Sequence, residues 1–224
     1  MEKIQGALID MDGVLYDSMP GHTLAWWRMM TEAGFDVPRD EFYLYEGMTG
    51  HATIRMLYRR DRGADVSEEE CRRLYARKSA YFSEWGEPPL MPGTADVLRI
   101  LREKGAVCVL VTGSGQQSLL DRVRSDYPGI FADGHMVTSR DVTHGKPDPE
   151  PYLKGAEIAG VSPGNCLVVE NAPLGVVAGK RAGAFVCAVT TGPIPRDEFV
   201  KAGADMIFGN MHEFAAWLDK NLVP

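Results

Sequence analysis

The sequence predicts an α/β protein with a doubly wound, Rossmann-like parallel sheet. Short apolar runs such as AVCVLVT at 106–112 recur along the chain, and helical patterns separate them. These runs are rich in β-branched residues and do not alternate with polar ones, which is typical of strands buried on both faces of a parallel sheet. From residue 93 onward strand and helix alternate, as in doubly wound folds.

Each predicted element follows from this rhythm. Strands are expected at 6–10, 106–112, 135–138, 166–170, 185–189 and 205–208. Helices are expected at 94–104, 115–126, 149–160, 173–182, 195–202 and 211–221.

The region 18–86 breaks the alternation, because it contains no convincing strand. Its segments are helical in pattern and are expected at 21–34, 39–46, 50–62 and 67–84. The stretch GEPPLMPG at 86–93 has the composition of a linker. We therefore expect a helical cap at 18–86, inserted after the first strand of a core formed by 1–17 and 87–224.

Composition and charge exclude several classes of function. The 224 residues carry a net charge of -7, which argues against a nucleic-acid partner. The apolar stretches are too short to cross a bilayer, and MEKIQGALID shows no signal-peptide pattern. The four cysteines show no CxxC spacing and no accompanying histidine cluster. We expect a cytoplasmic monomer with no membrane partner.

Polar residues stand where four of the predicted strands end. They are Asp10 and Asp12, then Thr112, Gly113 and Ser114, then Lys146, and finally Glu170 and Asn171. Ligands of doubly wound sheets bind at the carboxyl ends of the strands, so these residues are expected in one pocket. Taken singly, each has an ordinary structural explanation: a turn aspartate, a surface lysine or a helix N-cap asparagine. Their joint order along the chain favours a site.

These motifs resemble those of the haloacid dehalogenase superfamily, in the branch that contains β-phosphoglucomutase. The resemblance rests on DMDGV at 10–14, Thr112, Lys146 within GKP, and ENAPLG at 170–175. It extends over essentially the whole chain and implies an α-helical cap, as inferred above. It also implies phosphoryl transfer through an aspartate.

The expected chemistry assigns a role to each motif. Asp10 is expected to attack phosphorus and form an aspartyl phosphate, and Asp12 to act as general acid and base. Lys146, Thr112 and the backbone N–H groups around Gly113 and Ser114 are expected to bind the phosphoryl oxygens. The cofactor is expected to be Mg²⁺, because oxygen ligands are available at this edge. Its ligands would be Asp10, the Asp12 carbonyl, Glu170 and Asn171.

The cap sequence bears on the substrate. When YEGMTGHATI is aligned with the cap loop of β-phosphoglucomutase, Glu46 and Gly50 stand at two special positions. There the resemblance implies a lysine and an arginine that hold a second phosphate. Glu46 is expected to compensate for Asn171, which replaces the usual aspartate, and this pair resembles inorganic pyrophosphatases of the branch. His22 matches a cap histidine that handles the leaving-group proton. The alternatives are a solvent-facing Glu46 and a helix-end His22.

The predicted function is a Mg²⁺-dependent phosphohydrolase for a small phosphorylated substrate, with inorganic pyrophosphate as one candidate. The alternatives are a β-phosphoglucomutase-type sugar phosphate mutase and a sugar-phosphate phosphatase. A binding module that has lost activity is disfavoured, because the one core change is the conservative Asn171.

Overall fold

The computed structural model describes residues 4–115 and 117–222 and contains a six-stranded parallel sheet in the order β3-β2-β1-β4-β5-β6. Its strands are β1 (Gly6–Ile9), β2 (Val107–Val111), β3 (Met136–Val137), β4 (Cys166–Glu170), β5 (Phe185–Val189) and β6 (Met206–Phe208). The strand order reverses at β1, which pairs with β2 on one side and β4 on the other. The predicted fold class is confirmed, and β1 lies where such sheets bind ligands.

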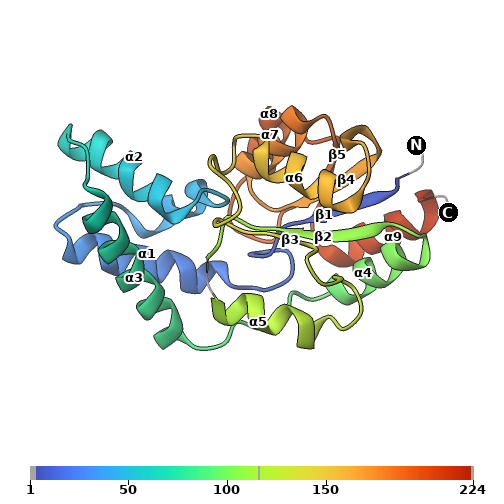
Figure 1. The fold of residues 1–224 in the computed structure, drawn as a ribbon, viewed down its shortest axis with the longest axis horizontal. Coiled ribbons are helices and arrows are strands. Elements are labelled where there is room, and N and C mark those ends of the chain that lie inside the picture. Colours follow the sequence, from blue (N-terminus) through green and yellow to red (C-terminus); the bar gives the residue numbers. More distant parts are fainter. Residues whose placement is uncertain (1–3, 116, 223–224) are drawn as a thin grey trace.

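Helices cover both faces of the sheet (Figure 1). One face carries α4 (Thr94–Glu103), α5 (Gln117–Asp126) and α9 (Met211–Asn221). The other carries α6 (Glu150–Ala159), α7 (Pro173–Ala182) and α8 (Arg196–Ala202), with a short 3-10 turn, η2, at Pro163–Asn165. Successive side chains of β1 enter opposite cores, with Ile9 in one and Leu8 in the other. This double burial is why the strands contain so few polar residues.

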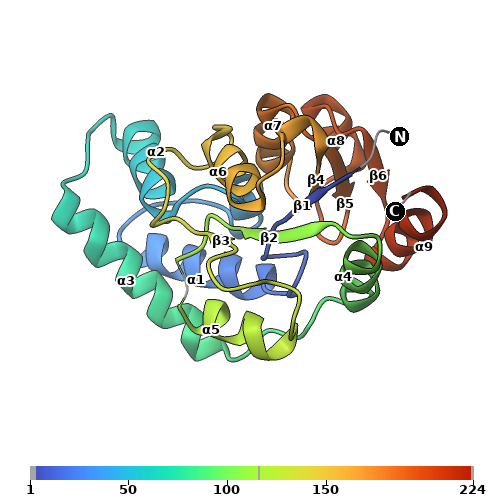
Figure 2. The ribbon, with the colours of Figure 1, turned by 45° about the vertical axis from the view of Figure 1, so that its right-hand side comes forward.

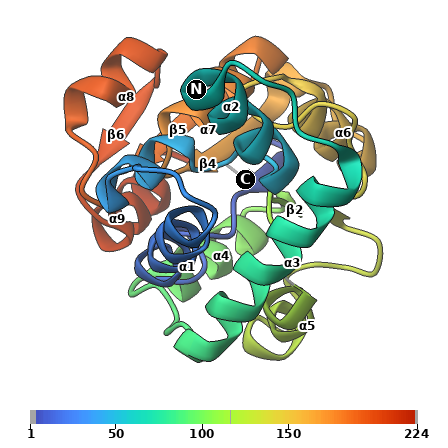
Figure 3. The same ribbon diagram turned by 90° about the vertical axis from the view of Figure 1, so that its left-hand side faces the viewer.

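The cap is helical and has a hydrophobic core of its own. It consists of α1 (Met19–Glu32), the 3-10 helix η1 (Arg39–Tyr45), α2 (Gly50–Arg62) and α3 (Glu68–Trp85). Buried residues from all four elements form this core, among them Met29, Phe42, Leu57 and Leu74. In Figure 2 the cap helices lie at one end of the molecule, and in Figure 3 they stand in front of the core when seen from that end.

Two chain segments connect the cap to the core and run side by side. Tyr16 and Leu90 form an antiparallel bridge, and the backbone N–H of Met91 donates to the carbonyl of Leu15. The N–H of Asp17 donates to the carbonyl of Pro89 in the same ladder. This paired hinge holds the cap over the carboxyl ends of the strands.

Local chemistry explains the differences from the predicted boundaries. Helix α1 begins at Met19, two residues before the prediction, because Pro20 is favourable in a first turn. The segment expected at 39–46 is a 3-10 helix that ends at Tyr45, and Glu46 then adopts φ -57 and ψ 137. That conformation directs the chain toward the core. Across the described residues, none of the helices is both long and apolar enough to cross a membrane.

Candidate active site

The turn after β1 presents two aspartates at the centre of the sheet edge. Asp10 follows Ile9 directly, and its backbone N–H donates to the carbonyl of Val169 on β4. Gly13 turns the chain back with φ 77, and a Cβ there would overlap the side chain of Asn171. A glycine is therefore required at this position, because it lets the β1 and β4 ends approach each other.

Lys146 fixes the orientation of Asp10. Its Nζ lies 2.6 Å from Asp10 Oδ1, 2.6 Å from Glu170 Oε1 and 3.1 Å from the carbonyl oxygen of Val111. Burial lowers the pKa of Lys146, but the two carboxylates outweigh burial and raise it, so the ammonium stays charged. All three N–H groups of the ammonium are engaged, and the one that reaches Asp10 contacts Oδ1 rather than Oδ2.

Glu170, at the end of β4, is held by four donors. Its Oε1 accepts from Lys146 and from the hydroxyl of Tyr152, which lies 2.5 Å away. Its Oε2 accepts from the backbone N–H groups of Asn171 and Ala172. The sequence analysis proposed Glu170 as a metal ligand and did not single out Tyr152. Each oxygen of Glu170 already accepts from two protein donors, and its role as a metal ligand stays a prediction.

The cap contributes a buried chain of polar groups that ends on Asp12. Nζ of Lys78 lies 2.6 Å from His22 Nδ1, and His22 Nε2 lies 3.0 Å from Asp12 Oδ1. An ammonium can only donate, so Nδ1 accepts and Nε2–H donates to Asp12. The hydroxyl of Ser18 donates to the same Oδ1 at 2.6 Å. His22 does stand in the first turn of α1, as the helix-end alternative has it, but it is also buried and contacts Asp12.

These contacts set the charge state of Asp12. Burial raises the pKa of Asp12, but His22, Ser18 and Lys78 together outweigh burial and lower it. Burial and the Lys78 charge lower the pKa of His22, so the imidazole is neutral. Asp12 is therefore an ionised carboxylate held in one orientation.

Sequence reasoning did not find Lys78, although a signal was present. Leu74, Lys78 and Phe82 recur every four residues on α3, and all three are buried. Spacing of four residues places side chains on one helix face, so a lysine in that series had to enter the interior. Lys78 is 3% exposed, which is rare for an unpaired lysine and points to a specific partner.

Glu46 reaches the core from the cap. It is 6% exposed, and its Oε1 accepts from Asn171 Nδ2 at 2.6 Å. The interpretation of Glu46 as a solvent-facing residue is therefore wrong. Burial raises the pKa of Glu46 well above its usual range; the Asn171 hydrogen bond opposes this shift, and the charges of Asp10, Glu170 and Asp12 add to it.

The oxygens around Asp10 fit a hard divalent cation. Asn171 Oδ1 is buried and has no hydrogen-bond partner in the described part of the chain, and such orphaned oxygens are uncommon. The pKa of Asp10 is raised to about 8. Burial is the largest cause, the negative charges of Glu170 and Asp12 add to the shift, and the positive charge of Lys146 opposes it. Within 4–115 and 117–222, no group of three Asp, Glu, His or Cys side chains could hold a metal ion. The expected ligands that could hold a cation are a mixed set, namely the Asp10 carboxylate, the Asp12 carbonyl and the Asn171 amide oxygen, and such oxygen ligands suit Mg²⁺.

The loop after β2 meets the cap. The backbone N–H of Ser114 donates to Thr112 Oγ1 at 3.0 Å, and the N–H of Gly115 donates to the hydroxyl of Tyr75 on α3. A Cβ at Gly113 would overlap the carbonyl oxygen of Gly47 in the cap loop. This close backbone approach shows that the cap is closed on the core.

A small cavity of about 60 Å³ lies between the cap and the core. From the predicted set it is lined by Asp10, Asp12, His22, Glu46, Thr112, Gly113 and Ser114. Lys146, Glu170 and Asn171 are not among its lining residues. The structure thus brings all predicted residues together in two layers, one facing the cavity and one behind it.

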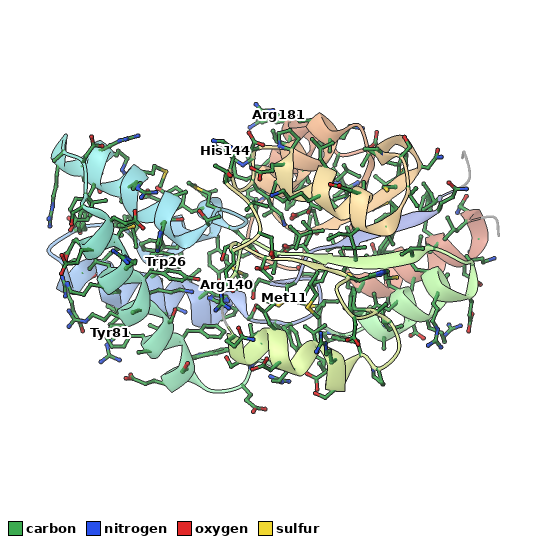
Figure 4. The ribbon with its side chains drawn as sticks, in the orientation of Figure 1. Met11, Trp26, Tyr81, Arg140, His144 and Arg181 are labelled. Atoms are coloured by element: carbon green, nitrogen blue, oxygen red, sulfur yellow. The ribbon has the colours of Figure 1, made fainter. Side chains whose placement is uncertain are left out.

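The cap side of this cavity includes an aromatic wall. Trp26, Phe42, Tyr45 and Tyr75 line it, and the rings of Trp26 and Phe42 are stacked at 6.1 Å. Figure 4 shows Trp26 on the cap side of the boundary and Met11 on the core side. Such walls are typical of pockets for organic ligands, in which a few polar groups fix the orientation.

Comparison with known proteins identifies the family. The model of the haloacid dehalogenase-like hydrolases matches residues 4–183. The chain belongs to the haloacid dehalogenase-like hydrolases. It is 32% identical to hexitol phosphatase A of Escherichia coli over 84% of this chain and 83% of that protein. It is 30% identical to a phosphorylated carbohydrates phosphatase of Thermotoga maritima over 80% of this chain and 82% of that protein.

The chain is also similar in structure to proteins whose structures have been solved. One from Bacteroides vulgatus, described as a candidate β-phosphoglucomutase, has a TM-score of 0.91 and 44% identity. The match covers 96% of this chain and 88% of that one. The resemblance inferred from the four motifs is thereby confirmed at the level of the superfamily and branch. The finer likeness to pyrophosphatases is not supported, because the E. coli and T. maritima relatives take their names from a hexitol and from phosphorylated carbohydrates.

Proposed function

We propose that this protein is a Mg²⁺-dependent phosphatase that transfers a phosphoryl group through Asp10 and acts on a small phosphorylated carbohydrate. The observation that carries the proposal is the Lys146 clamp, which holds Oδ1 of Asp10 and leaves Oδ2 to attack. The family and its phosphatase members support the same chemistry.

The reaction has two displacements. In the first, Asp10 Oδ2 forms a bond to phosphorus while the bond to the leaving oxygen breaks, which gives an aspartyl phosphate. In the second, a water oxygen attacks the same phosphorus and releases phosphate and free Asp10. When bound, Mg²⁺ would be held by Asp10, the Asp12 carbonyl and Asn171, and it would neutralise phosphoryl charge. Thr112 and the adjacent N–H groups would bind the remaining phosphoryl oxygens.

Asp12 handles the protons of both displacements. Its ionised carboxylate is suited to accept a proton from the attacking water, because His22 and Ser18 stabilise the charged form. To donate to the leaving group in the first step, Asp12 must first gain a proton, and a bound phosphoryl dianion favours that by its own negative charge. The Lys78–His22 pair keeps the carboxylate in place throughout.

The aromatic cap wall supports an organic leaving group. Trp26, Tyr75 and their neighbours offer apolar surface, which suits a sugar or polyol better than a second phosphate. The cavity of about 60 Å³ has room for a few water molecules, so we expect the cap to open further when a carbohydrate phosphate binds. Opening about the paired hinge is the motion that would expose Asp10.

Pyrophosphate is the second candidate, and one observation favours it. Glu46 is buried beside Asn171 at the proposed metal site. When ionised there, it would add negative charge that a bound Mg²⁺ would balance against a small anionic substrate. Against it, Lys78 is the one lysine or arginine among the described residues that line the cavity, and its ammonium is bound to His22. The same shortage of cations disfavours a mutase, which must hold a second phosphate.

A phosphate-release screen with Mg²⁺ tests the proposal. The panel comprises hexitol phosphates, hexose phosphates, glycerol phosphate, pyrophosphate, and β-glucose 1-phosphate with a bisphosphate primer. We expect the highest kcat/KM on a sugar or polyol phosphate. A pyrophosphate value at least tenfold above all others would establish the second candidate instead, and isomerisation without phosphate release would establish a mutase.

The variant Glu46→Gln separates the two hydrolase candidates further. If pyrophosphate is the substrate, loss of the charge should lower kcat/KM on pyrophosphate by about 100-fold or more while an aryl phosphate suffers less. For a carbohydrate phosphatase we expect similar, smaller losses on both substrates. The matched control is Glu41→Gln in η1, the 3-10 helix that precedes Glu46, where the Glu41 carboxylate contacts Tyr45 and Arg60 within the cap.

A further inference from the structure

Tyr152 is a fully buried tyrosine that lies directly under the catalytic lysine. It belongs to α6, and its hydroxyl donates to Glu170 Oε1 at 2.5 Å. Its ring centroid lies 5.0 Å from Nζ of Lys146, within the range of a cation–π contact. The cavity lining does not include Tyr152, so this side chain does not border the substrate space.

The position of Tyr152 restricts how Lys146 approaches Glu170. A carboxylate oxygen accepts along two main lone-pair directions. At Oε1 the Tyr152 hydroxyl takes one of them and Lys146 the other, while Oε2 is occupied by the backbone N–H groups of Asn171 and Ala172. Lys146 is left with one approach, and from it the ammonium also reaches Asp10 Oδ1 at 2.6 Å.

We propose that Tyr152 is a positioning residue, which acts through Glu170 to hold Lys146 against Oδ1 of Asp10. The proposal rests on the proposed function, in which Lys146 leaves Oδ2 as the attacking oxygen. Without the hydroxyl, the second acceptor direction of Oε1 opens. Lys146 can then turn toward Glu170 and away from Asp10, so the nucleophile loses its fixed orientation.

The test compares Tyr152→Phe with Tyr127→Phe. Tyr127 is also buried in the core, but its hydroxyl donates to the carbonyl of Leu15, remote from Lys146. We expect Tyr152→Phe to lower kcat by about 10- to 100-fold, as for loss of a hydrogen bond to a charged group, with KM changed by less than about threefold. Tyr127→Phe should leave kcat within about twofold. Equal kcat losses in the two variants would overturn the proposal.

A double-mutant cycle with Glu170→Gln tests the route of the effect. If Tyr152 acts through the Glu170 carboxylate, Tyr152→Phe should cost less than about threefold in the Glu170→Gln background, because the shared interaction is already weakened. Additive losses would show that Tyr152 acts by some other route, and would overturn the proposal.

A crystal structure of Tyr152→Phe gives a readout that does not need turnover. We expect Nζ of Lys146 to move beyond hydrogen-bond distance of Asp10 Oδ1, more than about 3.5 Å away. An unmoved Lys146 would overturn the proposal even if kcat falls. A wild type that is inactive on every phosphate ester, with Lys146 displaced in the variant, would refute the proposed function and leave the positioning role of Tyr152 standing.

Discussion

Replacement of Lys78 by methionine should raise the stability of the protein near neutral pH while it lowers activity. Lys78 is almost fully buried under the rings of Trp26 and Phe82, and its one close polar partner in the described structure is His22. Burial lowers the pKa of Lys78 from 10.5 to about 7. A methionine fills much of the same space without a charge to bury.

The size of the effect follows from proton linkage. A lysine whose pKa is lower in the folded state destabilises folding, fully so below the folded pKa and progressively less as pH rises toward the unfolded pKa. For Lys78, with the folded pKa of about 7, the loss is about 5 kcal/mol below pH 7, at about 1.36 kcal/mol per pH unit. At pH 9 it shrinks to about 2 kcal/mol. The hydrogen bond to His22 offsets about 1.5–3 kcal/mol at pH 6, where the ammonium is charged, and about 0.5–1.5 kcal/mol at pH 9, where the amine is neutral.

Urea denaturation in the presence of a chelator at pH 6 and pH 9 measures this difference. We expect Lys78→Met to exceed the wild type in unfolding free energy by about 2–3 kcal/mol at pH 6, and this advantage to fall to about 1 kcal/mol at pH 9. The control Lys220→Met alters an exposed lysine on α9 and should show no such pH dependence. A stability difference that is constant between pH 6 and pH 9 would refute the reasoning.

The kinetic consequence is opposite in sign. Without Lys78, Nδ1 of His22 loses its donor, and the imidazole is no longer fixed as an Nε2–H donor to Asp12. We expect kcat to fall by about 10- to 100-fold, as for a lost hydrogen bond to a charged group. Steady-state kinetics on the best substrate of the screen checks this.

Four further outcomes are expected. Asp10→Asn should show no phosphate release above background, since an amide is not a nucleophile; measurable turnover would exclude the covalent route. Asp12→Ala should lose about 10²–10⁴-fold in kcat, and a loss below tenfold on a poor leaving group would assign the proton to another residue. Gly113→Ala should lower kcat/KM at least about tenfold because its Cβ would strike the carbonyl of Gly47 when the cap closes, whereas Gly164→Ala, which meets nothing, should be neutral. Excess chelator should stop turnover and Mg²⁺ restore it; activity that persists would remove the metal from the mechanism.

The core of the site could be read from the sequence because parallel strands impose a simple geometry. Asp10, Thr112 and Glu170 each stand at the end of an apolar run, and adjacent parallel strands end at one edge. Local patterns therefore sufficed for the sheet, the helices and the residues at the strand ends. The helical cap was likewise visible as a break in the alternation.

The partners of these residues depend on contacts between segments far apart in the chain. Glu46 meets Asn171 across 125 positions because the paired hinge closes the cap on the core. Lys78 meets His22 across 56 positions because α3 packs on α1 within the cap. The contact between Tyr152 and Glu170 needs α6 packed on the sheet. By itself, the sequence determined the fold, which follows from local periodicity, and it predicted Asp10 as the nucleophile from strand-end geometry and the motif resemblance. Only the tertiary structure decided which buried donors orient the site residues, because a side chain's hydrogen-bond partner depends on how whole elements pack.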